Sequence, residues 1–334
     1  MLRFILRRLL QMIPLLLGLS LLIFAWVRVL PGGPAQALAN EDATVADIAA
    51  IERSLGLDRP VYVQYLEFLG KAARLDFGNS LQSNRPVTEE MIARFPASLE
   101  LSVCALLLAI LVGVPLGYFA ARRYGSRLDK ISVFGSLLGI TIPVFFLAYL
   151  LKYVFAVKLG WLPTTGRLDA RIVAEHPTGF YVLDGIVTGN WPAAWSALNH
   201  LILPAIALGT IPMALIARIT RASVLDVVNE DYVRTAQAKG LYASTITFRH
   251  ILRNALIPLV TILGLQLGAL ISGTVLTETV FSFSGVGRFV ANAILVRDYP
   301  TIQGFVIVIG LLYVCVNLLV DLAYGLVDPR VRVH

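Results

Sequence analysis

The stretch VRTAQAKGLYASTITFRHILRNALIP, residues 233–258, lies between two long apolar runs of the chain. It carries four Arg or Lys residues and no Asp or Glu, and Gly240 lies near its middle. Basic segments between apolar runs are typical of the loops that join membrane-spanning helices on the cytoplasmic side. The rest of the sequence therefore has to establish whether those runs cross a bilayer.

The composition is that of a membrane protein. Of 334 residues, 57% are hydrophobic and 15% are charged, whereas soluble domains carry about 25% charged residues. A helix needs about 20 apolar residues to cross the hydrocarbon core. Six stretches meet or nearly meet this length, so we expect an all-α polytopic membrane protein with about six transmembrane helices. They are residues 9–30, 97–121, 131–157, 201–217, 256–277 and 301–324; the fourth is short, and its helix is expected to continue past Arg218.

The distribution of Lys and Arg predicts the orientation. If both termini are cytoplasmic, the inner segments carry fifteen of the 28 Lys and Arg residues and only five of the 21 acids. Cytoplasmic loops are enriched in Lys and Arg, so the net charge of +7 is explained by topology. We therefore expect a multi-pass membrane protein with cytoplasmic N- and C-termini, in contact with lipid and not with nucleic acid.

Three regions follow from this topology. Residues 1–30 form a tail and first span, which is too long and too closely followed by PGGP to be a cleaved signal. Residues 31–96 form an amphipathic periplasmic segment, in which Thr44 and Asp47 match a helix capping box and Gly56 suits the helix end. Residues 97–334 form the core transmembrane region, with a cytoplasmic loop at about 218–256.

Polar and small residues mark further features. Trp161, Trp191 and Trp195 in the predicted outer loop 160–199 are typical of an aromatic belt. Glycine pairs spaced by four predict close helix packing. These pairs are Gly113/Gly117, Gly135/Gly139 and Gly264/Gly268. The ionisable residues within the spans, Glu100, Lys152 and Asp321, are explained by pairing or by snorkelling near span ends.

Signatures of catalysis are missing from the sequence. No G-x-x-x-x-G-K-[ST] phosphate loop occurs. The four histidines never pair at metal-ligand spacing, and the two cysteines lie inside apolar runs. We therefore expect a non-enzymatic chain with no catalytic residues, no cofactor and no metal site.

The basic stretch itself predicts a helix, a turn and a second helix. Residues 218–239 can continue as one helix out of the fourth span, and Gly240 permits a sharp turn. Ser244 is expected to cap the second helix. Small residues at positions 236 and 238 are expected to allow a close approach to a partner. Along the second helix, one face is expected to hold Ile246, Arg249, His250 and Arg253.

With EDYVRTAQAKGL followed by HILRNALIP, the stretch resembles the cytoplasmic loop of permease subunits of binding-protein-dependent ABC importers, in their peptide and nickel branch. Arg234-Thr235-Ala236 stands where the superfamily generally has Glu-Ala-Ala, a departure that the peptide branch shares. Segments along the whole chain, among them LGLDRPVYVQYLEFLG, RFPASLELSVC and LPAIALGTIPMALIARITRASVLDVV, resemble the first of the two permeases of dipeptide importers. Phe283-Ser284 replaces the usual Trp-Pro.

The resemblance implies a type I ABC importer permease fold in the bacterial inner membrane, with residues 97–334 as the core permease domain. It also implies a role in importing dipeptides or short peptides. It implies a second, similar permease, one or two cytoplasmic ABC ATPases and an extracytoplasmic peptide-binding protein as partners. In such a loop the residues expected to couple the chain to an ATPase are Asp231, Arg234, Ala236, Lys239, Gly240, Arg249, His250 and Arg253.

Alternatives stay open at this stage. Nickel, glutathione or haem-like compounds are possible substrates of the same machinery, because selection rests largely on the binding protein. From different classes, the chain could be a stand-alone secondary carrier or channel, or a structural membrane scaffold. Uptake by the purified chain without ATPases would favour the carrier, and the absence of any uptake defect on deletion would favour the scaffold.

Overall fold

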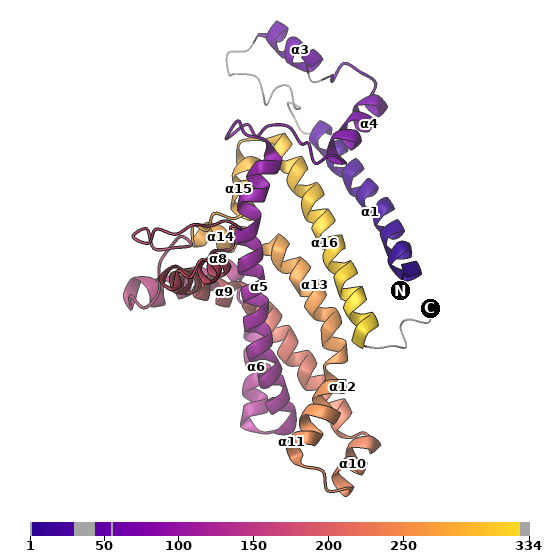
Figure 1. Cartoon of the computed structure of the whole chain (residues 1–334), viewed down its shortest axis with the longest axis vertical. Helices are drawn as coiled ribbons and strands as arrows, with labels where there is room; N and C mark the ends of the chain where they lie inside the picture. The colour runs from indigo at the N-terminus through magenta and orange to yellow at the C-terminus, as the bar shows by residue number, and fades with distance from the viewer. Residues whose placement is uncertain (1, 30–43, 55, 328–334) are drawn as a thin grey trace. The chain divides into compact units, whose positions relative to one another are not determined.

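The computed structural model describes residues 2–29, 44–54 and 56–327 and is built of helices, as expected (Figure 1). Within these residues the only β-type pairing is an isolated bridge between Asn79 and Pro86. The helices, including the π-helical η1 and η2, are α1 (Leu2–Val29), α3 (Val45–Ser54), α4 (Val61–Ala72), α5 (Val87–Arg122), α6 (Arg127–Thr141), α7 (Val144–Leu151), η1 (Lys152–Lys158), α8 (Tyr181–Val187), α9 (Trp191–Val228), α10 (Asp231–Ala238), α11 (Ala243–Thr245), η2 (Ile246–Leu252), α12 (Arg253–Ala255), α13 (Ile257–Gly273), α14 (Val275–Val280), α15 (Val286–Leu295) and α16 (Tyr299–Val327).

Two compact units divide the chain. The first comprises Met1–Pro96 with Gly285–Cys315, and the second comprises Ala97–Ser284 with Val316–His334. Two of the boundaries fall within α5 and α16, so these helices contribute to both units, and the third lies between α14 and α15.

Local signals define the helices of the first unit. The predicted capping box at the start of α3 is confirmed: the Thr44 amide donates to Asp47 Oδ2 at 2.9 Å, and the Asp47 amide donates to Thr44 Oγ1 at 3.3 Å. The Thr44 donors also lower the pKa of Asp47, because they stabilise its charged form. Gly56 has φ +65°, the left-handed conformation expected after the helix.

Long-range polar contacts complete the first unit. Arg28 on α1 donates from both Nε and Nη2 to Gln64 Oε1 on α4, at 3.0 and 2.6 Å. Asp298 is fully buried and accepts from the hydroxyls of Ser80 and Thr301, at 2.6 and 2.8 Å. It also accepts from the Thr301 amide in the first turn of α16, so one carboxylate caps α16 and fixes a loop more than 200 positions earlier in the chain.

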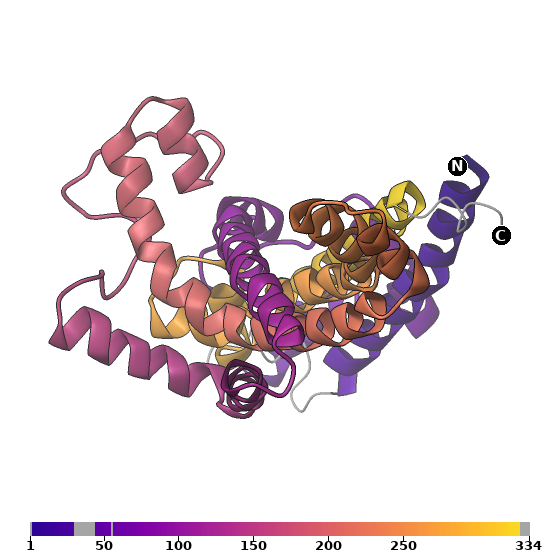
Figure 2. The ribbon, with the colours of Figure 1, turned by 90° about the horizontal axis from the view of Figure 1, so that it is seen from below.

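The long helix α9 organises the second unit and lies against α6, α7, α8 and α13. Figure 2 shows α8 folded back beside the first turns of α9. At Gly113 and Gly209 a Cβ would come within 2.8 Å of the carbonyl oxygens of Met213 and Ala105, respectively. The close packing expected around Gly113 is therefore present. In the second pair, Gly139 lies close to Thr210 whereas Gly135 has open space around it.

Four described helices are long and apolar enough to cross a membrane, or up to six if each of two bent pairs is one span. The fourth predicted span lies within α9, which has 38 residues, so its extension past Arg218 is confirmed. The third, 131–157, was wrongly expected to be one helix, because α6 and the α7–η1 helix meet at 103°. Pro143 is the cause: it disfavours helix at the preceding residue, and Ile142 is extended with ψ 123°.

Candidate functional site

The basic loop, defined here as residues 229–256, leaves α9 at a break that the sequence did not reveal. The predicted single helix 218–239 is wrong, since α9 ends at Val228 and α10 begins at Asp231. Glu230 between them is extended, with ψ 145°. The turn predicted at Gly240 is present, with φ +70°. Glycine adopts this left-handed conformation without a steric cost, whereas a β-branched residue does not.

The second helical run of the loop also differs from expectation. It begins at Ala243 after Tyr242, with no side-chain cap, so the predicted cap by Ser244 is wrong. Residues 246–252 are π-helical, and i→i+5 hydrogen bonds change the angular spacing of side chains. Ile246 is therefore buried while Arg249 and Arg253 are exposed, and the predicted common face does not form.

An apolar base holds the loop to the second unit. Val233 and Ala236 of α10 pack with Ile251 and Ala255 of the second run and with Val224 of α9. Val233 and Ile251 are fully buried. Ala236 is only 4% exposed, so the methyl group of this predicted coupling residue serves packing inside the loop.

The remaining predicted coupling residues are on or near the surface. His250 is half-buried, and the others are exposed. Arg234 lies 3.6 Å from Asp231, with side chains 68% and 97% exposed, so solvent screens the pair. The exposed residues are Asp231, Arg234, Lys239, Gly240, Arg249 and Arg253.

Four exposed apolar or aromatic side chains of the basic loop were not identified from the sequence. Tyr232 is 41%, Leu241 40%, Tyr242 83% and Phe248 70% exposed. Apolar groups that stay exposed among charged neighbours are typical of surfaces that bind another protein. The available signal was the Leu-Tyr pair directly after the turn glycine, where a polar residue would suit a solvated loop.

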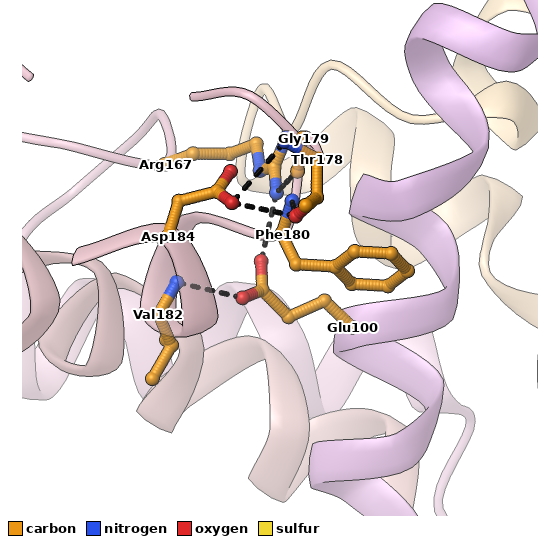
Figure 3. Close-up of polar contacts among 7 residues, drawn as sticks. All are labelled: Glu100, Arg167, Thr178, Gly179, Phe180, Val182 and Asp184. Carbon is orange, nitrogen blue, oxygen red and sulfur yellow. Dashed lines mark hydrogen bonds and ion pairs between the residues drawn. The ribbon is translucent and has the colours of Figure 1, made fainter. Parts of the chain in front are cut away.

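A second polar site lies in the segment between η1 and α9, called here the 160–190 loop, which includes the short helix α8. The charges of this site are buried. Arg167 Nη2 donates to Glu100 Oε2 of α5 at 2.7 Å and to the Gly179 carbonyl at 2.8 Å. The other carboxylate oxygen of Glu100 accepts from the Val182 amide in the first turn of α8, at 2.8 Å (Figure 3). Both side chains of the ion pair are at most 7% exposed. The pairing expected for Glu100 is thus present, but its partner Arg167 was not predicted.

Aromatic contacts complete this cluster. The guanidinium carbon of Arg167 lies 3.7 Å from the Tyr181 ring centroid, and the His176 ring stacks on the same ring at 3.5 Å. Two groups this close to one ring must occupy opposite faces, so Tyr181 is enclosed between them. Burial lowers the pKa of His176, and the nearby Arg167 charge adds to this effect.

The other ionisable residues expected within spans have different outcomes. Lys152 donates from Nζ to the Val280 carbonyl at 2.7 Å, which places a cation at the C-terminal end of α14. The side chain of Asp321 lies outside the described residues. Among those described, no three His, Cys, Asp or Glu residues are grouped so that they could hold a metal ion.

Comparison with known proteins places this architecture in a family. The family described as "Binding-protein-dependent transport system inner membrane component" matches residues 113–333, and "Binding-prot-dependent transport system membrane comp, N-term" matches residues 1–102. The inward-facing MetNI methionine ABC transporter has a similar fold, with TM-score 0.52 and 15% identity over 71% of this chain and 96% of that chain.

Curated relatives match nearly the whole chain. The dipeptide transport system permease protein DppB of Alkalihalophilus pseudofirmus is 44% identical over 99% of this chain and 100% of its own length. DppB of Escherichia coli K12 is 44% identical over 99% of both chains, and the glutathione transport system permease protein GsiC of Salmonella choleraesuis is 38% identical over 99% of both. The protein thus belongs to the family of inner-membrane components of binding-protein-dependent transport systems.

Proposed function

We propose that the chain is the permease subunit of an ATP-driven importer of dipeptides or other short peptides. The full-length similarity to dipeptide permeases from two bacteria supports this substrate class. Its partners would be a second, similar permease that completes the pathway, one or two cytoplasmic ABC ATPases and a periplasmic peptide-binding protein. Residues 1–30 would hold the N-terminal tail and the first span, 31–96 the periplasmic segment and 97–334 the core, with both termini cytoplasmic.

The basic loop is proposed to be where the ATPase acts. The observation that carries this assignment is a surface of cations and apolar side chains around Gly240, fixed on a buried apolar base. A partner that contacts this surface differently with and without ATP would shift the permease between its states, because a ligand shifts an equilibrium only by its differential affinity. The base would transmit the shift to α9.

Replacement of Gly240 tests this role. Gly240→Val forces a β-branched residue into a left-handed conformation, whereas Gly240→Asn is the matched control, because Asn tolerates that conformation. In the complete transporter reconstituted in vesicles, we expect Gly240→Val to lower substrate-stimulated ATPase activity about tenfold and Gly240→Asn to change it little. Membrane insertion should be normal in both. Equal stimulation in the two variants would contradict the assignment.

Glutathione is the second candidate substrate, because the relative GsiC is 38% identical over the same length. A deletion strain complemented with this chain and its partners separates the candidates. Uptake of dipeptides, longer peptides, glutathione and nickel is measured side by side. Dipeptide uptake supports the first candidate, and uptake of glutathione alone supports the second. Uptake by the purified chain without any ATPase would instead indicate a secondary carrier.

A further inference from the structure

The 160–190 loop is attached to α5 by contacts that leave it little freedom. Glu100 receives two hydrogen bonds from this part of the chain, from Arg167 at 2.7 Å and from the Val182 amide at 2.8 Å. These donors lie at the start of the loop and in the first turn of α8, so one carboxylate fixes both (Figure 3). Buried charge-assisted hydrogen bonds of this length are among the stronger polar contacts in proteins.

A second set of contacts orders the loop internally. Thr178 donates from its hydroxyl and its amide to Asp184 Oδ1, at 2.6 and 3.2 Å. Arg167 donates to the Gly179 carbonyl and covers one face of Tyr181. Arg167 therefore contacts α5, the turn before α8 and the first residue of α8 itself.

The helices on which the loop rests are packed backbone to backbone. A Cβ at Gly185 of α8 would lie 2.6 Å from the Ala194 amide nitrogen of α9, and one at Gly209 of α9 would lie 2.8 Å from the Ala105 carbonyl oxygen of α5. Such contacts prevent the helices from sliding past one another without backbone movement. Further along α9, Val224 belongs to the apolar base of the basic loop. Within the second unit, packed contacts thus run from the basic loop to the 160–190 loop.

We propose that Arg167 is a positioning residue for transport: it makes the 160–190 loop move together with α5 and α9 when an ATPase acts on the basic loop. This inference rests on the proposed function, because it assumes that work enters at the basic loop. In this arrangement ATP hydrolysis does not require Arg167, but conversion of the helix movement into substrate transfer does.

The test compares Arg167→Ala with Arg171→Ala, an exposed arginine of the same loop, in the complete transporter in vesicles. The measurements are the melting temperature, substrate-stimulated ATPase activity and dipeptide taken up per ATP hydrolysed. We expect Arg167→Ala to keep stimulated ATPase activity and to lower uptake per ATP about tenfold. Arg171→Ala should match the native protein, and Arg167→Lys, which keeps the charge, should recover part of the loss. A folded Arg167→Ala transporter with native uptake per ATP would overturn the proposal.

A measurement on the unaltered transporter covers the case in which Arg167→Ala does not fold. Hydrogen exchange of the amides of residues 178–184 is compared between the nucleotide-free and the ATP-trapped states. If the loop moves with α5, these amides stay equally protected in both states. Exchange about tenfold faster in one state, with α5 still protected, would show that the loop detaches and would overturn the proposal. Failure of the coupling role is separately visible, as unchanged ATPase stimulation in Gly240→Val.

Discussion

The basic loop and the 160–190 loop are both polar connections between apolar helices, yet they use charge in opposite ways. In the basic loop, Asp231 and Arg234 are 3.6 Å apart and largely exposed. In the 160–190 loop, Arg167 pairs with Glu100 at 2.7 Å, and both are almost fully buried. Exposed charges are screened and available to a partner, whereas buried charges lock the parts that carry them. Burial therefore decides whether an ion pair is available to a partner or holds parts of the chain together.

The largest effect is expected when the buried pair is broken. Glu100→Ala leaves Arg167 without its carboxylate and the Val182 amide without its acceptor. Removal of one partner from a buried ion pair costs about 3–5 kcal/mol. We therefore expect a marked fall in the melting temperature of the purified protein in detergent. The control is Glu175→Ala, an exposed acid of the same loop, and a similar melting temperature for both variants would contradict the contrast.

A smaller effect is expected when the contact between α5 and α9, which lies between the two loops, is overpacked. Gly209→Ala places a methyl group 2.8 Å from the Ala105 carbonyl oxygen, so the backbones of α5 and α9 must separate. Overpacking of this kind costs about 1–3 kcal/mol. Gly135→Ala is the matched control, because a Cβ there meets nothing within 4 Å and alanine favours helix. Thermal unfolding should show destabilisation in the first variant only.

The pH dependence of stability tests the contribution of His176 in the 160–190 loop. The pKa of His176 is lowered in the folded protein, mainly by burial. Below the ordinary histidine pKa of about 6.5 the unfolded chain therefore binds more protons, and the free energy of unfolding falls as the pH falls. We expect His176→Gln to reduce this dependence in melting temperatures measured between pH 5 and 8. An identical pH profile in the variant would exclude a contribution from His176.

The smallest effect is expected at the exposed pair. Asp231→Asn removes a carboxylate whose side chain is 97% exposed, and exposed pairs contribute about 0–1 kcal/mol. The melting temperature should be nearly unchanged. If the basic loop binds an ATPase, the same variant should instead alter the salt dependence of transporter assembly. A large loss of stability would show that this pair is not solvated as described.

Much of the fold was predictable because its signals are local. Apolar run lengths located the spans, the Thr44–Asp47 spacing located a helix start, and Gly240 located the turn of the basic loop. These features depend on residues within a few positions of one another. The two helix breaks were less predictable. Pro143 did carry a local signal for the bend after Ile142, but the break between Val228 and Asp231 has no proline or glycine to mark it.

The sequence by itself determined that this is an all-helical membrane protein with a basic loop, since composition and short-range patterns are sufficient for that. The resemblance of that loop to those of importer permeases then indicated the family. Tertiary structure alone decided which charges are buried. Arg167 and Glu100 are 67 positions apart and meet only because α5 and α8 pack on α9. Likewise, an alanine at position 236 fits either an exposed or a buried site, and only the packing of α10 places it in the core. Contacts between distant positions depend on the whole fold, so no local pattern specifies them.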